Sequence, residues 1–228
     1  FKRDRANFET LLYQTFRDPG SQTSQNTQSP TGLSIGTGVR IVSSEKIYNQ
    51  GNIINTDNSL DMTIDGKGFF QVLMPNGQIA YTRAGNFTKN QQGQIVTANG
   101  YPIEPAITIP ENTTSVSISK DGIVSVTTAG TTAVQQVGQL QIATFPNNSG
   151  LRPTGESLLL STPSSGDPVV ANPATDGAGR IVQGALESSN VNVVEELVQM
   201  IETQRAYEVN SKAISAVDQM MKNLTQSM

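Results

Sequence analysis

The chain has 228 residues and a net charge of -4, with a pI near 4.9. This acidic balance argues against nucleic-acid binding, which needs a concentrated basic surface. Histidine and cysteine are both absent, so the usual base at neutral pH, the commonest metal ligands and the thiol nucleophile are missing. We therefore expect no cofactor and no metal site. No apolar run approaches the ~20 residues that cross a bilayer, so we also expect no membrane insertion.

Residues 1–17 are compatible with two structures. Phe1, Phe8 and Leu12 fit one face of a helix only loosely, and the same residues could lie on an extended lead-in. The chain begins with Phe rather than Met, which suggests that the natural N-terminus has been removed or omitted.

The next segment, residues 18–59, begins without charge. From Pro19 to Val39 no side chain is charged, and Ser, Thr, Gln, Asn and Gly predominate. This composition by itself favours a flexible linker. The alternative is an extended arm packed against other molecules, because its many polar side chains could satisfy the backbone. Short strands are expected at 39–42 and 46–48, where the hydrophobic period changes to two.

Residues 60–185 carry the pattern of an antiparallel β domain, which is a series of short alternating segments separated by turn signals. Such spacing predicts a sandwich or a partly open barrel. The predicted turns are Asp65–Gly68 between 60–64 and 69–74, Asn76-Gly77 before 78–82, Gln92-Gly93, Asn99-Gly100, and Asp121-Gly122 between 115–119 and 123–127.

The second half of this domain gives weaker signals. Residues 137–145 read as one further half-buried strand. Five prolines fall between residues 146 and 180, so we expect mostly surface loops there, with Leu158–Leu160 as the convincing strand. Residues 180–186 are expected to form a last strand that leads into the C-terminal segment.

Residues 186–228 are predicted to contain one long helix. Asn192 and Glu195 stand three residues apart, the spacing of an N-cap and a capping box. No Gly or Pro follows them, so the helix should run for roughly 35 residues, or about 50 Å. A β domain of ~130 residues is only about 30–40 Å across. The chain's own domain therefore cannot cover such a helix.

An apolar stripe runs along this helix at alternating steps of three and four residues. We expect it to pack in coiled-coil fashion against helices of a missing N-terminal segment and of other chains. Gln204 and Ser211 interrupt the stripe, as expected of an interface that needs a fixed register. The predicted subunit interface consists of Leu197, Ile201, Gln204, Tyr207, Ser211, Ile214, Val217, Met221 and Leu224.

The titratable residues form no recognisable catalytic constellation, and we expect no enzymatic activity. Lys67 lies in Asp-Gly-Lys-Gly, a β-turn pattern whose spacing is not that of a phosphate-binding loop. Asp57, Asp61 and Asp65 are four residues apart, but in a β context they would not converge on a cation. Arg83 is expected to pair within the fold or with a neighbouring subunit.

Two long motifs resemble the signatures of the bacterial flagellar rod and hook proteins. The helix entry LESSNVNVVEELVQMIETQRAYEVNSKAI at 186–214 resembles the family's C-terminal signature, and LDMTIDGKGFFQVLMPNGQIAYTRAGNFTKNQQGQIVTANGYPI at 60–103 resembles the other. The opening FKRDRANFETLLYQ is similar to the sequence after the family's N-terminal helix. Residues 1–17 would then be a remnant behind that missing helix. The uncharged segment after Tyr13 resembles the stretch that distinguishes the straight rod from the flexible hook.

The resemblance implies a mainly β protein with a long terminal α-helix. Its antiparallel β domain would be inserted between N- and C-terminal segments that form a coiled-coil inner layer. Such proteins are exported by the flagellum's own type III apparatus and polymerise helically into a hollow tube that transmits torque. Their partners would be copies of themselves, neighbouring rod and hook proteins, and the surrounding ring proteins. Their place would be the basal body, from the periplasm to the outer membrane.

On this interpretation, residues 18–42 are an arm wedged between neighbouring subunits, which blocks sliding and stiffens the tube. Its expected contact residues are Tyr13, Phe16, Pro19, Pro30, Leu33 and Ile35. A hook or proximal-rod subunit is the nearest alternative within the family. A secreted β-domain binding module, such as an adhesin, is the alternative from another class. That module would need an aromatic-lined site, which the absence of Trp makes less attractive,.

Overall fold

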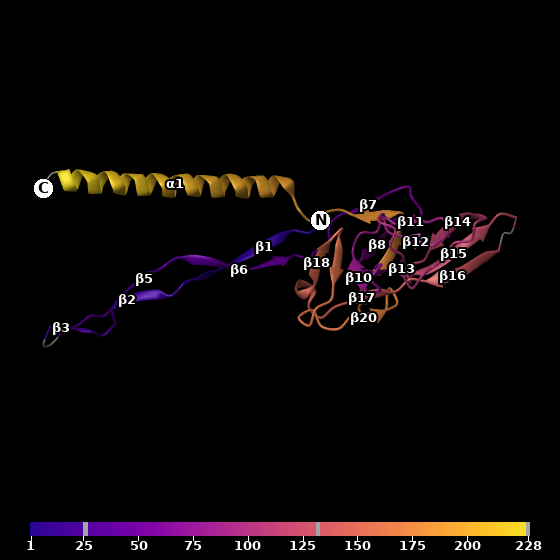
Figure 1. Ribbon diagram of the computed structural model, residues 1–228, viewed down its shortest axis with the longest axis horizontal. Helices are drawn as coiled ribbons and strands as arrows, with labels where there is room; N and C mark the ends of the chain where they lie inside the picture. Colours follow the sequence, from indigo (N-terminus) through magenta and orange to yellow (C-terminus); the bar gives the residue numbers. More distant parts are fainter. Residues whose placement is uncertain (25–26, 131–132, 227–228) are drawn as a thin grey trace.

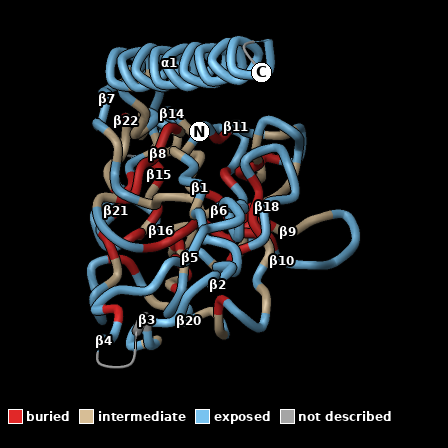
Figure 2. Tube along the Cα trace, turned by 90° about the vertical axis from the view of Figure 1, so that its left-hand side faces the viewer, coloured by how far each residue is buried: buried red, intermediate tan, exposed pale blue. Residues whose placement is uncertain are grey.

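The computed structural model describes residues 1–24, 27–130 and 133–226. The molecule has three parts, which we call the arm (residues 1–48), the body (residues 49–187) and the helix α1 (Val193–Gln226). The arm and α1 leave the same end of the body and extend in the same direction (Figure 1). The buried residues are concentrated in the body, whereas α1 has none and the outer arm, where the structure describes it, has only Ser29 (Figure 2).

The arm is a long antiparallel hairpin. Strand β1 (Asp4–Thr10) pairs with β6 (Val39–Lys46), and β2 (Tyr13–Arg17) pairs with β5 (Leu33–Gly36). Strands β3 (Gln22–Ser24) and β4 (Thr27–Gln28) pair at its outer end. Residues 1–17 are thus extended wherever they form regular structure, and the helical alternative is wrong. Residues 18–39 contain the returning strand, so they are no free linker; residues 25 and 26 lie outside the described part.

Cross-strand charges hold the inner half of the arm in register. Lys46 Nζ lies 2.9 Å from Asp4 Oδ1, and Arg40 Nη2 lies 3.2 Å from Glu9 Oε2. Arg5 pairs in the same way with Glu45. Opposite charges that face each other on neighbouring strands contribute roughly 0.2–1 kcal/mol per pair. The strand predicted at 39–42 continues to Lys46 as β6, which this ladder of charges aligns with the N-terminal segment, whereas the strand predicted at 46–48 does not form, because residues 47 and 48 lie outside β6.

The body is built on a seven-stranded antiparallel sheet with the order β18-β19-β10-β9-β17-β20, and β13 also pairs with β9. A three-stranded sheet, β14-β15-β16, forms the end of the body away from the arm (Figure 1). The strands of the body are β7 (Ile53–Asn55), β8 (Met62–Asp65), β9 (Phe69–Leu73), β10 (Ile79–Thr82), β11 (Thr88–Lys89), β12 (Ile95–Val96), β13 (Ile103–Glu104), β14 (Thr113–Ile118), β15 (Ile123–Thr128), β16 (Val134–Gln139), β17 (Ile142–Thr144), β18 (Arg152–Gly155), β19 (Leu158–Leu160), β20 (Val169–Ala171), β21 (Arg180–Gln183) and β22 (Ala185–Glu187), with a short 3-10 helix at Asn148–Gly150.

Most of the predicted turns connect paired strands. Asn76-Gly77 joins β9 to β10, Gln92-Gly93 joins β11 to β12, and Asp121-Gly122 joins β14 to β15. The turn at Asp65–Gly68 does not close a hairpin, because β8 pairs with β21 and not with β9. The chain changes sheets at this turn, where Gly66 and Gly68 both have positive φ, at 114° and 138°.

The second half of the body contains more strand than the sequence suggested. Residues 137–145 include parts of two strands, β16 and β17, and not one. The proline-containing stretch includes β18 and β20 besides the predicted strand at Leu158–Leu160. The predicted last strand at 180–186 is divided into β21 and β22 at Gly184, whose φ is 71°. This break lets β22 leave β8 and pair with β7.

The core of the body has two aromatic clusters. In the larger one, Phe70 and Phe87 are fully buried and meet edge to face, with ring centroids 5.2 Å apart. In the smaller one, the ring of Phe145 contacts Phe69 and Tyr81 in the same geometry. Edge-to-face pairs add about 0.5–1.5 kcal/mol beyond the burial of their area. The body therefore has the ordinary requirements of an independently folded domain.

We predict that the body unfolds as a unit whose stability does not depend on the exposed strands of the arm. Phe70→Ala should lower the free energy of unfolding by roughly 3–5 kcal/mol, because it leaves a cavity in the core. The matched change Phe8→Ala, at a side chain that is 67% exposed in the arm, should stay within about 0.5 kcal/mol. Urea unfolding of the unassembled chain, followed by near-ultraviolet circular dichroism, makes the comparison. Equal losses for the two variants would contradict it.

Candidate assembly interface

Nothing in the described structure covers α1. The helix has 34 residues and none of them is buried. The apolar members of the predicted interface range in exposure from 48% at Ile201 to 75% at Tyr207. All of its members lie on exposed positions of α1, namely Leu197, Ile201, Gln204, Tyr207, Ser211, Ile214, Val217, Met221 and Leu224. The structure thus places these residues where another chain could reach them.

The spacing of the predicted interface residues indicates a supercoil. Leu197, Gln204 and Ser211 follow one another at steps of seven, and so do Tyr207, Ile214 and Met221. A strict seven-residue repeat drifts by about 20° per repeat around a straight helix. A partner that follows such a seam must wind around α1 in a left-handed sense.

Further apolar residues of α1, which the sequence analysis did not single out, lie beside the predicted seam. Val194, Val198, Val209 and Met220 are each at least half exposed. Val194 and Val198 each precede a seam residue by three positions, and Met220 precedes one by four, so they share its face of the helix,. Val209 falls on the opposite side. The exposed apolar surface is therefore wider than the seam near both ends of α1.

The start of α1 has a cap, as the sequence suggested. The side-chain oxygen of Asn192 accepts a hydrogen bond from the Val194 amide at 3.1 Å. Glu195 lies in the first turn, where the helix dipole favours a carboxylate. The reciprocal capping-box bond from Glu195 to the Asn192 amide does not occur among the described contacts. Glu196 instead forms an ion pair with Arg3, at 2.8 Å, and so ties α1 to the N-terminal segment.

The predicted contact residues of the arm lie on its outer half. Tyr13, Phe16, Leu33 and Ile35 are 51–65% exposed. Pro19 and Pro30 are also exposed, and they flank the contact in which the Gly20 amide donates to the carbonyl of Ser29. These side chains are free of contact with the body and available to another molecule.

The inner half of the arm carries an apolar patch that the sequence analysis did not single out. Phe8 faces Ile41 across the ladder, and Val39 faces Thr10 on the same side of the ribbon. Phe8, Val39 and Ile41 are 64–67% exposed. The sequence signal for this patch was the alternation of apolar and polar residues in 4–10. It could be interpreted only once the pairing with β6 was known.

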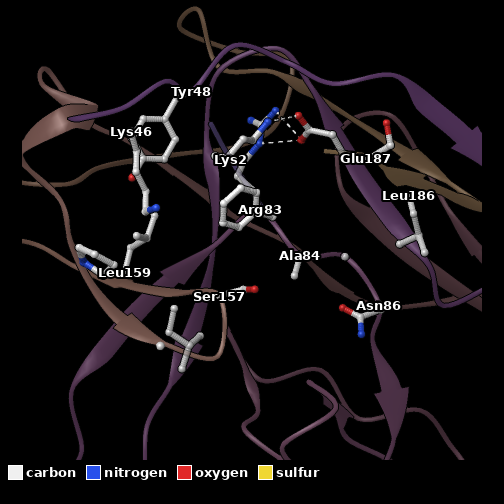
Figure 3. A pocket seen from close by; sticks show the side chains of 16 residues that line it. Lys2, Lys46, Tyr48, Arg83, Ala84, Asn86, Ser157, Leu159, Leu186 and Glu187 are labelled. Atoms are coloured by element: carbon white, nitrogen blue, oxygen red, sulfur yellow. Dashed lines mark hydrogen bonds and ion pairs between the residues drawn. The ribbon is translucent and has the colours of Figure 1, made fainter. Parts of the chain in front are cut away.

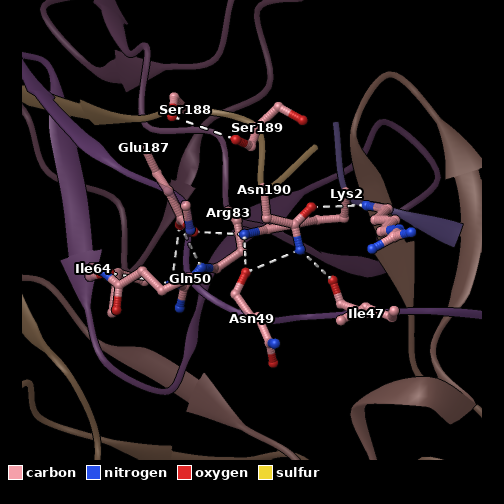
Figure 4. Close-up of polar contacts among 12 residues, drawn as sticks. Lys2, Ile47, Asn49, Gln50, Ile64, Arg83, Glu187, Ser188, Ser189 and Asn190 are labelled. Carbon is pink, nitrogen blue, oxygen red and sulfur yellow. Dashed lines mark hydrogen bonds and ion pairs between the residues drawn. The ribbon is translucent and has the colours of Figure 1, made fainter. Parts of the chain in front are cut away.

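The arm, the body and the lead-in to α1 meet at one buried carboxylate, that of Glu187. Its Oε1 accepts from Lys2 Nζ at 2.6 Å and from the Gly51 amide at 2.9 Å, and its Oε2 accepts from Arg83 Nε at 3.0 Å (Figure 4). The Glu187 side chain is 4% exposed, against 13% for Lys2 and 14% for Arg83. Arg83 therefore pairs within the fold, which was one of its two predicted roles. We call these four residues the junction.

The junction controls the protonation of its carboxylate. Burial by itself would raise the pKa of Glu187, but the hydrogen bonds from Lys2 and Gly51 and the charges of Arg83 and Lys2 hold the pKa below its usual value,. Nearby, burial and then the charge of Asp4 raise the pKa of Tyr48 to about 12. Glu187 is thus ionised and Tyr48 neutral at any physiological pH.

A cavity of about 540 Å³ lies beside the junction, between the N-terminal residues and the β18–β19 hairpin (Figure 3). Its wall is mainly apolar, with Tyr48, Leu159 and Leu186 among the lining residues, and Lys2 and Arg83 at one side. Within the described residues no group of three or more acidic, His or Cys side chains could hold a metal ion. In the same part of the chain, no helix combines the length and apolarity needed to cross a bilayer.

Comparison with known proteins gives the class to which this architecture belongs. Residues 63–126 match the family model of the flagellar hook protein FlgE/F/G D1 domain, and residues 182–227 match that of the flagellar basal body rod FlgEFG protein C-terminal region. The chain belongs to this family of flagellar rod and hook proteins.

Similar relatives carry one particular name within that family, flagellar basal-body rod protein FlgG. The chain is 54% identical to the one from Buchnera aphidicola subsp. Schizaphis graminum, 53% to that from Buchnera aphidicola subsp. Acyrthosiphon pisum and 48% to that from Caulobacter vibrioides. Each similarity covers 99% of this chain and 87% of the relative. The likeness therefore includes the arm, the body and α1, and not the body alone.

We predict that the junction stabilises the fold at neutral pH and not in acid. The depressed pKa of Glu187 contributes stability that is fully present above its unfolded pKa and is lost as the pH falls through the lower folded pKa,. At pH 7, Glu187→Gln should lower the free energy of unfolding by up to roughly 3–5 kcal/mol, which is the cost of leaving a buried charge unpaired. The loss should be smaller to the extent that water hydrates Lys2 and Arg83.

Urea unfolding of the wild type and of this variant at pH 7 and pH 3 measures the difference. The gap should narrow in acid, because the unfolded wild-type chain then takes up a proton that the folded carboxylate resists, and the wild type loses that part of its stability,. The control is Asp65→Asn, which breaks the more exposed pair between Arg180 and Asp65 and should cost at most about 1 kcal/mol at pH 7. A gap between wild type and Glu187→Gln that persists unchanged at pH 3 would count against the charge as the cause.

Proposed function

We propose that this chain is a structural subunit of the flagellar distal rod, which polymerises helically into a hollow, rigid tube and transmits torque through the cell envelope. The observation that carries the proposal is the 34-residue helix without a single buried residue, in a chain whose relatives along its whole length are basal-body rod proteins. Family membership makes it a structural component of the basal body.

The physical argument begins with the exposed apolar surface. Burial of apolar area contributes roughly 25 cal/mol per Å², so a helix of about 50 Å with an exposed apolar stripe along its length gains strongly from a partner. The second copy of the chain supplies matching surface. Contacts that use different surfaces on the two copies are heterologous, and they generate a helical filament when the rotation between copies does not close.

The arrangement of the parts suggests how such a tube is layered. We place α1 in the inner layer as a coiled coil, and the body in the outer layer. The arm would lie between neighbouring copies and block their sliding. The support for this placement is that both the arm and α1 expose apolar residues and extend from one end of the body (Figure 1).

Partners and place follow from the same proposal. Neighbouring rod and hook components would join the two ends of the tube, and ring proteins would surround it. The tube would span from the periplasm to the outer membrane. Its subunits would leave the cell through the flagellum's own type III apparatus.

We predict that a charge in the seam of α1 prevents assembly. In Ile214→Asp the carboxylate would be buried between subunits without a partner, which costs several kcal/mol at each contact. The matched control is Ala216→Asp, which carries the same side chain on the side of the helix opposite Tyr207,. Electron microscopy of concentrated protein should show filaments for the wild type and the control, and dispersed molecules for Ile214→Asp. Filaments of normal length from Ile214→Asp would reject the seam as an interface.

We predict that the outer arm stiffens the filament and is not needed for its formation. Deletion of residues 18–38 should yield filaments whose persistence length, measured on electron micrographs, is several-fold shorter. A second variant, Leu33→Ser with Ile35→Ser, keeps the full arm and removes two apolar side chains, so it separates contact from mere length. Filaments that stayed as straight as the wild type after the deletion would remove the arm from the account of stiffness.

A further inference from the structure

We infer that Glu187 is the positioning residue that fixes the direction of the arm relative to the body, and with it the angle between the arm and α1. The carboxylate holds an ammonium from the N-terminal segment, an amide from the connection between arm and body, and a guanidinium from the body. It lies at the end of β22, close before α1. A single buried anion thus joins every segment that leaves this end of the molecule.

The arm has little else to hold it in place. Its strands pair only with one another among the described residues. Beyond its covalent continuation after Tyr48, the arm meets the body through Lys2 and through the ring of Tyr48, which packs on Phe69 with centroids 5.6 Å apart. Asn190, in the lead-in to α1, binds the arm at the carbonyl of Ile47. A two-stranded ribbon with such a narrow base would swing freely unless its base were fixed.

Arg83 fixes the other side of the carboxylate. Its guanidinium also donates to the carbonyls of Ile64, Gly66 and Gly68, at 2.8–3.2 Å. These carbonyls belong to β8 and to the turn at which the chain changes sheets. Because the planar guanidinium presents its donors in a fixed fork, the body sets the position of the Glu187 carboxylate. The carboxylate in turn sets the position of the Lys2 ammonium.

The approach of the connecting chain is equally tight. A side chain at Gly51 would place its Cβ 2.0 Å from the carbonyl oxygen of Ser188. The Gly51 amide can therefore reach the carboxylate only because no side chain separates the two segments. Ser188 in turn donates its amide to the carbonyl of Asn52 at 2.8 Å. The backbone after β22 and the backbone after the arm thus lie directly against each other.

Asn190 extends the same fixation toward α1. Its amide nitrogen donates to the carbonyls of Ile47 at 2.8 Å and Asn49 at 3.2 Å, and its oxygen accepts from the Arg3 amide at 2.8 Å (Figure 4). Arg3 then reaches the first turns of α1 through Glu196. The root of the arm is consequently held from two directions, by the Glu187 carboxylate and by the Asn190 amide.

The inference deepens the proposed function, because an arm that points in one direction can meet the same surface on every neighbour. It can nevertheless be tested on the unassembled chain, so its failure would leave the proposed rod function standing. The chain contains no cysteine, and Gln14→Cys with Ser115→Cys introduces two exposed sites for spin labels, on the arm and on the body. Pulsed electron resonance then gives the distribution of distances between them.

We expect a narrow distribution for the wild-type background, and a distribution at least twice as wide after Glu187→Gln. Lys2→Met leaves the contact between Arg83 and Glu187 in place and releases the arm alone. This variant should therefore widen the distance distribution as well. The control Asp65→Asn breaks an exposed pair within the body and should leave the width unchanged.

A second label pair, Gln78→Cys with Ser115→Cys, lies entirely within the body and reports whether each variant is folded. It should remain narrow throughout. A narrow arm-to-body distribution in Glu187→Gln would overturn the inference, since Glu187 would then stabilise the fold without orienting the arm. Broadening of both label pairs to the same extent would overturn it too, because the effect would be general loosening. Broadening of the arm pair alone, in Glu187→Gln and in Lys2→Met, supports it.

Discussion

The apolar surface of α1 has no cover within its own molecule, and the architecture of the chain follows from that constraint. Isolated helices in water gain little from propensity alone, and in proteins most helical stability comes from packing. Here an apolar packing surface runs along the helix, yet none of its residues is buried. The chain is therefore complete only as part of an assembly, which agrees with its membership of the flagellar rod and hook family.

The three parts divide the physical tasks between them. The body buries two aromatic clusters and satisfies its own chain. The arm and α1 have no such core. A two-stranded ribbon is only marginally stable by itself, and an isolated helix leaves its apolar stripe exposed to water. Polar contacts around Glu187 and Asn190 connect the stable body with the arm and with the lead-in to α1. Such a buried pair gains little over an apolar replacement, but the removal of one partner is costly because it leaves a buried charge unpaired.

Local signals in the sequence predicted local structure well. The cap at Asn192 and the absence of Gly and Pro after it define α1, and Asn76-Gly77 closes the hairpin that it should. Long-range pairing was out of reach: nothing near residues 4–10 announces that they pair with residues 39–46, or that β8 pairs with β21. Lys2 and Glu187 are 185 positions apart, so their meeting could not be predicted from spacing. Periodicity and helix length predicted packing against other chains, and the resemblance to the family supplied the kind of assembly.

That both the arm and α1 project from one end gives the molecule a front and a back. When such molecules follow one another in a column, every copy faces the same way, so the finished column is polar. At one end of the column the arms and α1 helices of the last copies have no neighbour, and at the other end the surface is formed by the bodies. A molecule whose shape fits one end of the column does not fit the other end. Growth of the column and its attachment to other components therefore take place at different ends.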